Sequence, residues 1–275
     1  MKKILLISLT LIIAVSKPCF CEENSVSTDK FLKAIDAGDV NTVKQMLEGN
    51  QALANARREG RKVEPVSALY CAIKARNKEI AVLLLAKGAN VNDTMYDGVA
   101  VARTPLNALF AAAKYDFVEI IPLLATYGAN PNQLTLMFGP PLAFAKRADV
   151  VRELIKAGAQ VNLTDKDLRT PLFYVSSAEA AEALIDAGAN VNAEDSRGLT
   201  PLFCAGRKKT ELLIAHGANV NQKTKIGLTL LENALRGTNE IGKTSDPNVF
   251  DTARFLIANG SEYSIEDVAR IGDKD

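Results

Sequence analysis

The chain has 275 residues, of which 48% are hydrophobic and 24% are charged. This composition is typical of a folded protein and excludes a largely disordered chain. The chain has one histidine and no tryptophan, and this shortage counts against metal sites and acid–base sites built on histidine.

Residues 1–21 are predicted to form a secretory signal peptide. Two early lysines precede an apolar run, Ile4 to Val15, which is too short to span a membrane. We expect cleavage after Cys21, with Ser16 as a second site, and a mature protein that is periplasmic or secreted. A lipid-anchored form is the alternative, but the bulky neighbours of Cys19 and Cys21 do not fit a lipoprotein signal.

The mature part is nearly neutral. Removing residues 1–21 takes away three lysines and no acidic residue, so 30 basic residues remain against 32 acidic ones and the net charge is about −2. This balance does not favour nucleic acid or an anionic membrane surface as a partner.

Residues 29–50 are predicted to form an opening helical unit with an inner turn at Gly38. Its apolar stripe comprises Phe31, Leu32, Ile35, Val43, Met46 and Leu47. The next segment, Gly49 to Pro65, is interpreted as a solvated linker. The alternative is that its basic cluster, Arg57 to Lys62, steers an acidic partner.

The string Gly-Ala-Asn, or a variant of it, recurs after apolar helical runs. The glycines that mark it are Gly88, Gly128, Gly158, Gly188, Gly217 and Gly260, at intervals of 29 to 43 residues. A glycine in the left-handed conformation ends a helix, so each is expected to mark a helix C-terminus.

A second phrase keeps step with the first. It stands as Thr104-Pro105-Leu106, Thr170-Pro171-Leu172 and Thr200-Pro201-Leu202, with degenerate copies at Ser67, Pro141 and Thr229. We expect the threonine to cap a helix by accepting a hydrogen bond from a first-turn N–H, and the proline to occupy the first helical position. Each unit then holds two helices, and stacked units share one core.

These phrases resemble the ankyrin repeat over residues 29–263. The resemblance implies an all-α solenoid of about six to seven helix-turn-helix units with connecting loops or β-turn fingers. The repeat domain would span 22–275, with repeats at about 65–263 and a C-terminal cap at 264–275. Three shortened units, within 141–219, are expected to have short helices and lower local stability.

The family's signature histidine is absent. Tyr70, Asn107, Phe173 and Phe203 occupy its expected positions, so we expect aromatic packing to replace its hydrogen bonds. Towards the C-terminus, an insertion from Gly237 to Pro247 is predicted to be a mobile loop, and Ile265 to Ile271 a short closing helix.

Motifs for phosphate loops, zinc proteases and serine hydrolases are absent, so we expect no cofactor, no metal and no catalysis. His216 is expected at a helix C-terminus as a surface residue. Cys71 and Cys204 are expected to be buried in first helices about four units apart, too far for a disulfide. Two glycosylation patterns, at Asn92 and Asn162, are interpreted as coincidental.

The resemblance further implies that partners contact the loop tips and the exposed face of the first helices. The predicted partner-binding residues are Met95, Tyr96, Met137, Phe138, Lys166, Asp167, Arg169, Arg197 and Lys225, with Ser196 and Ile226 on the same loops. Met and aromatic side chains are common in binding cores. We therefore expect an apolar patch at loops 94–99 and 134–139, flanked by charges from loops 165–169 and 195–197.

Several functions fit this picture. The first is a monomeric envelope or periplasmic scaffold for a protein partner, with a toxin-neutralising inhibitor as one form. The second is a secreted effector that binds host proteins. A structural, self-assembling protein is a third, and an enzyme is the least favoured because no catalytic constellation is found.

Overall fold

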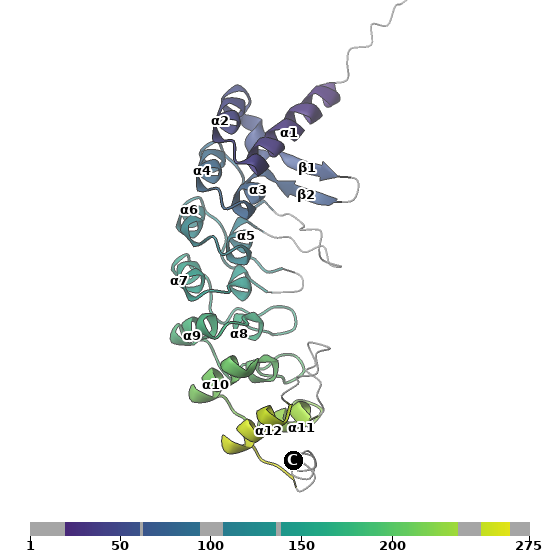
Figure 1. Cartoon of the computed structure of the whole chain (residues 1–275), viewed down its shortest axis with the longest axis vertical. Helices are drawn as coiled ribbons and strands as arrows, with labels where there is room; N and C mark the ends of the chain where they lie inside the picture. Colours follow the sequence, from purple (N-terminus) through teal and green to yellow (C-terminus); the bar gives the residue numbers. More distant parts are fainter. Residues whose placement is uncertain (1–19, 61–62, 94–106, 136–138, 236–248, 265–275) are drawn as a thin grey trace, which may run out of the picture.

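The computed structural model describes residues 20–60, 63–93, 107–135, 139–235 and 249–264. Seven helix pairs within these residues stack into an elongated solenoid (Figure 1), so the predicted fold class is confirmed. Residues 1–19 of the expected signal peptide, the insertion Gly237 to Pro247 and the expected closing helix Ile265 to Ile271 lie outside the described residues.

Each unit has a first helix and a second helix. The pairs are α1 (Phe20–Ala37) with α2 (Val40–Gly49), α3 (Ala68–Lys74) with α4 (Lys78–Ala86), α5 (Ala108–Lys114) with η2 (Val118–Ile120) and α6 (Ile121–Thr126), η3 (Pro141–Phe144) with α7 (Ala148–Lys156), α8 (Pro171–Tyr174) with α9 (Ala178–Asp186), η4 (Pro201–Cys204) with α10 (Arg207–Ala215), and α11 (Leu230–Leu235) with α12 (Val249–Ala258). The first helices lie between the second helices and the loops that project from the stack (Figure 1).

The opening unit starts earlier than predicted. Helix α1 begins at Phe20 rather than near residue 29, so the expected cleavage after Cys21 falls within its first turn. That cleavage stays a prediction. None of the helices in the described ranges is both long and apolar enough to cross a membrane.

The predicted linker from Gly49 to Pro65 is wrong. It contains the 3₁₀ helix η1 (Gln51–Asn55) and, with Ser67, an antiparallel hairpin of β1 (Arg57–Gly60) and β2 (Val63–Ser67). Arg57 forms an ion pair with Asp93, and Arg58 with Asp36. A glycine-flanked basic segment resembles a loop locally, but acidic side chains on neighbouring units pair with it. Arg61 and Lys62 lie outside the described residues.

The glycine stops are confirmed. The six glycines that the repeat marks have φ between +79° and +94°, the left-handed region that ends a helix. Several helix N-termini are capped as the residue types suggest. Ser67 Oγ accepts from Tyr70 N–H at 3.2 Å, and Asn77 Oδ1 accepts from Ile80 N–H at 3.0 Å.

The expected threonine cap is formed at Thr229, whose Oγ1 accepts from Glu232 N–H at 3.2 Å, but not at Thr170 and Thr200. Thr170 and Thr200 each precede a proline at the first helical position, but neither side chain makes a capping bond. The N–H groups of Phe173 and Phe203 donate instead to the carbonyl oxygens of these threonines, both at 3.0 Å. Each of these helices has only four residues and closes as a tight turn. The backbone carbonyl of the threonine therefore accepts the hydrogen bond that its side chain would accept at the start of a longer helix.

The third unit corrects the repeat register. Thr104-Pro105-Leu106 lies outside the described residues, and α5 begins only at Ala108. Asn107 is the capping residue, since its Oδ1 accepts from Phe110 N–H at 2.9 Å. The residue at the histidine position is therefore Phe110, not Asn107. Its ring packs on Phe144 of the next unit with centroids 4.0 Å apart, as expected of aromatic packing.

One apolar core runs through the stack. Its most regular feature is a buried leucine two residues after each cap position, namely Leu69, Leu109, Leu142, Leu172, Leu202 and Leu231, each at most 2% exposed. Burying such a side chain contributes about 1.5–3 kcal/mol relative to exposing it. The core thus depends on contacts between units more than on any single helix pair.

Asparagine side chains clamp each unit to the next. The clamp residues are Asn55, Asn92, Asn132, Asn162, Asn192 and Asn221. Each Nδ2 donates to the carbonyl of the next stop glycine at 2.8–3.0 Å. Each Oδ1 accepts from the backbone N–H two residues beyond that glycine at 2.8–2.9 Å. Asn92 and Asn162, the two glycosylation patterns, therefore have structural amides.

Candidate functional site

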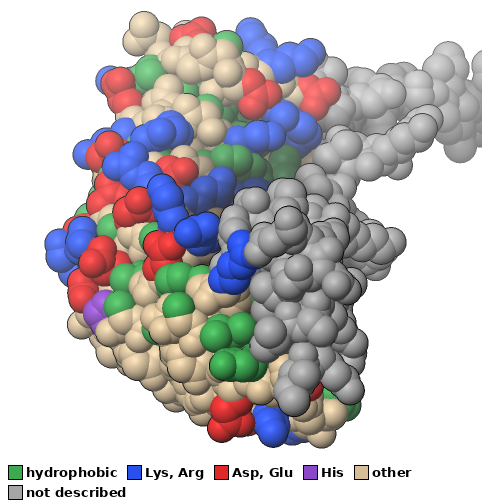
Figure 2. Space-filling model, turned by 60° about the horizontal axis from the view of Figure 1, so that its bottom comes forward, with side chains coloured by type: hydrophobic (Ala, Val, Ile, Leu, Met, Phe, Trp, Pro, Cys, Tyr) green, Lys and Arg blue, Asp and Glu red, His purple; other side chains and the backbone are tan. Residues whose placement is uncertain are grey.

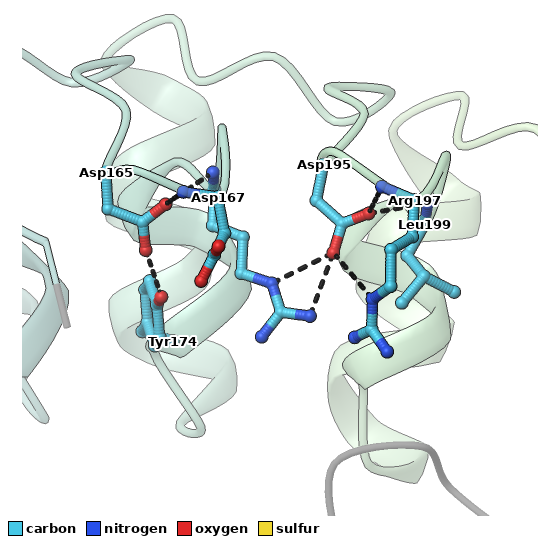
Figure 3. Close-up of polar contacts among 7 residues, drawn as sticks. Asp165, Asp167, Tyr174, Asp195, Arg197 and Leu199 are labelled. Atoms are coloured by element: carbon cyan, nitrogen blue, oxygen red, sulfur yellow. Dashed lines mark hydrogen bonds and ion pairs between the residues drawn. The ribbon is translucent and has the colours of Figure 1, made fainter. Parts of the chain in front are cut away.

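Three consecutive turns project from the stack, and we call them finger 4 (residues 165–169), finger 5 (195–199) and finger 6 (224–228). A buried side chain organises each finger from within. Asp165 Oδ1 accepts from the N–H groups of Asp167 and Arg169 at 2.8 and 2.9 Å. Asp195 Oδ1 does the same for Arg197 and Leu199 (Figure 3). In finger 6, Thr224 Oγ1 accepts from Leu228 N–H at 3.0 Å.

Backbone hydrogen bonds hold the fingers in a row. Ser196 N–H donates to the Asp167 carbonyl at 2.8 Å, and Lys225 N–H donates to the Arg197 carbonyl at 3.0 Å. The approach is close at Gly198, where an added Cβ would lie 3.0 Å from the Lys225 nitrogen. Glycine is required there by this contact and by a φ of +77°.

Arg169 is not at a finger tip, in contrast to the prediction. Its guanidinium bonds Asp195 Oδ2 through Nε at 3.0 Å and Nη2 at 2.8 Å, and the two side chains are 13% and 1% exposed (Figure 3). Arg197 approaches the same oxygen only to 3.9 Å and is exposed. Arg169 therefore cross-links fingers 4 and 5, because Asp195 offers a buried carboxylate one unit away.

Two further titratable groups lie beneath these fingers. The Tyr174 hydroxyl donates to Asp165 Oδ2, and burial, followed by this carboxylate, raises the pKa of Tyr174 well above its usual value. Cys204 is half-buried in η4, and burial raises the pKa of its thiol to about 11. Neither group is set up as a nucleophile, since a reactive thiol requires a lowered pKa.

A buried lysine joins the fifth and sixth units. Lys209 is 2% exposed, and its Nζ donates to the carbonyls of Leu172 at 2.6 Å and Val175 at 2.8 Å. Burial lowers the pKa of Lys209 to about 8. At the same position of their second helices, other units carry the apolar residues Ile80, Ile120, Val150 and Ala180, all 0% exposed. Lys209 thus substitutes a polar cross-link for an apolar contact.

The remaining predicted binding residues fall into two groups. Lys166, Arg197 and Lys225 are exposed on the three fingers, and Asp167 is half-buried. Ser196 is exposed, and Ile226 is 80% exposed. The predicted apolar patch of Met95, Tyr96, Met137 and Phe138 lies outside the described residues and stays a prediction.

Leu168 is a further finger residue that was not among the predicted binding residues. Its φ is +62°, while Gly198 and Gly227 hold the same turn position in fingers 5 and 6. The left-handed conformation costs a residue with a side chain about 1–2 kcal/mol relative to the right-handed one. Because the Leu168 side chain is 52% exposed, packing does little to offset that cost. Alignment of the three fingers on Asp165, Asp195 and Thr224 would have revealed it.

The first helices add exposed cations at their C-terminal ends. Five such cations are exposed where first helices lead into second helices: Lys74 ends α3, Arg76 and Lys146 lie in the turns, and Arg207 and Lys208 begin α10. Figure 2 shows Lys and Arg side chains in a band across the visible face, with Asp and Glu side chains beside it. Opposite charges are thus interspersed on this face, as on a typical protein-binding or solvated surface.

Among the described residues, no three His, Cys, Asp or Glu side chains are grouped so as to hold a metal ion. His216 is the exposed C-terminal cap of α10, as predicted. Cys71 lies buried in α3 as expected, whereas Cys204 in η4 is only half-buried. Both are free thiols in first helices.

Comparisons with known proteins agree with this architecture. A family model described as ankyrin repeats (3 copies) matches residues 31–135 and 142–224, more than half of the chain. The crystal structure of the human ASB11 ankyrin repeat domain aligns with a TM-score of 0.65 at 21% sequence identity, covering 85% of this chain and 99% of that one. At this identity the likeness concerns the fold alone. The comparison with curated proteins finds no match.

Proposed function

The chain belongs to the ankyrin repeat family, and we propose that it is a non-catalytic scaffold that binds another protein through its finger tips and inner helices. Ankyrin repeat domains are typically protein-binding scaffolds. Because repeat proteins keep the stack and vary its surface, the partner is to be sought in the surface residues of this chain.

The proposal rests on the different roles of buried and exposed side chains in the fingers. Buried side chains such as Asp165 and Asp195 hold the turns, whereas Lys166, Arg197 and Lys225 are exposed on them. The row is also tied together by backbone bonds, so little order has to be gained on binding. A pre-ordered row with variable exposed side chains is suited to recognition.

We further propose that the protein is exported, from the pattern of residues 1–21, and acts in the periplasm or outside the cell. An inhibitor of a toxin in the envelope and an effector that binds host proteins are the two forms to separate. Fractionation separates them, because retention in the envelope favours the first and release into the medium favours the second. Concentration-dependent self-assembly would favour a structural role instead.

The test is co-purification of the full chain, tagged at its C-terminus, from the cells that produce it. A variant with Lys166→Glu and Lys225→Glu disrupts the fingers' surface. The matched control, Lys78→Glu with Arg152→Glu, reverses two exposed charges on the second helices α4 and α7. A protein captured by the parent and the control but not by the finger variant supports the proposal. Equal capture by all three would place the binding surface elsewhere, and no capture would contradict the scaffold function.

A further inference from the structure

We propose that fingers 4, 5 and 6 bind an extended acidic segment of the partner protein that also carries aliphatic or aromatic side chains, with Leu168 as the apolar anchor. The inference rests on the proposed function and specifies the chemistry of the partner. It is carried by three features of the fingers: a strained exposed leucine, an outward excess of positive charge and a fixed spacing.

Leu168 is the unusual residue of the row. It adopts a left-handed backbone with φ of +62° where Gly198 and Gly227 stand in the next two fingers. Glycine at this position would relieve the strain, and the half-exposed Leu168 side chain contributes little to packing. Strained residues that the fold does not need are concentrated at ligand-contacting sites. An apolar contact with a bound segment accounts for a leucine at this position.

The second apolar contact lies two fingers away. Ile226, at the tip of finger 6, is 80% exposed, and it precedes the turn glycine Gly227 by one residue. Leu168 and Ile226 therefore stand on the outer two fingers of the row, with the exposed Arg197 on the finger between them. This order suits a segment with an acidic residue between two apolar ones.

The charges of the fingers are sorted by depth. Asp165 and Asp195 are only 5% and 3% exposed, and their oxygens are taken up by hydrogen bonds from their own unit or its neighbour. Lys166, Arg197 and Lys225 are exposed. Among the residues of the three fingers, the half-buried Asp167 is the one further acid. The fingers thus present positive charge outward, which complements an acidic partner.

The row is rigid enough to favour an extended segment. Ser196 N–H bonds the carbonyl of finger 4, and Lys225 N–H bonds the carbonyl of finger 5, at 2.8 and 3.0 Å. The bidentate contact of Arg169 with Asp195 adds a buried link between fingers 4 and 5. Side chains held at fixed intervals bind a partner with a matching repeat of contacts, and less entropy is lost than for mobile loops.

The experiment is selection of random twelve-residue peptides on the immobilised full chain, followed by affinity measurement of the selected peptides by fluorescence anisotropy. We expect enrichment of Asp and Glu together with aliphatic or aromatic residues. Leu168→Gly should weaken the affinity of the chain for the selected peptides about tenfold. The same change should leave the unfolding midpoint equal or higher, because the turn loses its strain. Loss of affinity without loss of stability excludes misfolding as the cause.

Charge reversal supplies the second arm. Lys166→Glu with Lys225→Glu should weaken binding at least tenfold and reduce its dependence on salt, whereas Lys78→Glu with Arg152→Glu should not. Selection of basic or uncharged peptides, or of peptides unaffected by both finger changes, would overturn the inference. In that case protein capture by the full chain can still succeed, so the scaffold function is judged separately. Failure of both peptide selection and protein capture would contradict both proposals.

Discussion

The second and third units differ from the fourth to sixth in how their first helices are held. Helices α3 and α5 have seven residues each and begin at the side-chain caps Ser67 and Asn107. The first helices η3, α8 and η4 have four residues each and no side-chain cap. The shorter units instead contain buried polar links, the Arg169–Asp195 pair and Lys209.

This contrast shows two ways of building the same stack. In the longer units, a capped helix supplies order locally. In the shorter units, we infer that order comes from bonds to the neighbouring unit, which act as interface terms of a one-dimensional array. The lower local stability expected for 141–219 stays a prediction, and four measurements sharpen the contrast.

The largest effect is expected from Asp195→Ala. This change leaves Arg169 buried without its partner and removes the acceptor for two backbone N–H groups, so unfolding should become easier by about 3–5 kcal/mol. Denaturant titration measures the loss, and hydrogen exchange should place it in the fifth and sixth units. The control is Asp149→Ala, which breaks an exposed ion pair with Arg147 and should change little. Equal effects of the two changes would contradict the cross-link role.

Lys209 should give the shorter units a pH dependence. Its pKa in the folded chain is lowered to about 8, so between about pH 8 and its ordinary value near 10.5 the unfolded state binds one more proton. Stability should therefore rise with pH in this window, at up to about 1.4 kcal/mol per pH unit. Below about pH 8 both states are protonated and the contribution is flat.

The measurement is the difference between the parent and Lys209→Met as a function of pH. The subtraction is needed because the pKa of Cys204 is raised to about 11, and a raised acid makes stability fall with pH over part of the same window. Lys208→Met, one residue away and exposed, is the matched control. Parallel pH profiles for the parent and Lys209→Met would show that burial does not shift this lysine.

Substitution of the clamp asparagines tests whether the bonds between units contribute equally to stability in the longer and the shorter units. Asn92→Ala and Asn162→Ala each remove one donor and one acceptor from an otherwise identical clamp. Each should lower the free energy of unfolding by about 1–2 kcal/mol, because two backbone groups lose hydrogen-bond partners at a contact that is partly exposed to water. The loss at Asn162 should open a larger part of the stack, which hydrogen exchange can resolve. Identical exchange patterns would remove the distinction between the regions.

The smallest expected effect has opposite signs in the two regions. The Oγ1 atoms of Thr170 and Thr200 are buried without a hydrogen-bond partner among the described residues. Thr200→Val should therefore be neutral or stabilising by up to about 1 kcal/mol. Ser67→Ala removes a working cap and should destabilise by about 1 kcal/mol. Thermal unfolding compares the two, and a clear loss in Thr200→Val would reveal a partner for its hydroxyl.

The local signals of the sequence predict the fold well. Glycine stops and proline starts are set by backbone conformation within a few residues, so the repeat is visible without tertiary contacts. The register of the third unit is not visible from local signals, because Thr104-Pro105-Leu106 has the pattern of a helix start although α5 is capped by Asn107. Twenty-one residues separate Asn107 from Gly128, as they do Ser67 from Gly88, and this spacing would have resolved it.

The candidate site is less predictable because its contacts join distant residues. Arg169 belongs to a loop by composition, but a buried carboxylate in the next unit turns it inward. The hairpin at residues 57–67 depends likewise on Asp36 and Asp93 in other units. Lys209 stands at a position that is apolar in other units, and no local sequence pattern predicts the two carbonyl oxygens that accept from its Nζ.

The clamp asparagines bear on how such a chain grows and shrinks in evolution. Each clamp uses a side chain on one unit but only backbone atoms on the next, and Gln160 and Glu262 receive it as well as Asn90 does. The connector is therefore one-sided, and a duplicated or deleted unit needs no matching substitution in its neighbour. Copy number can change by recombination while every joint keeps the same two bonds.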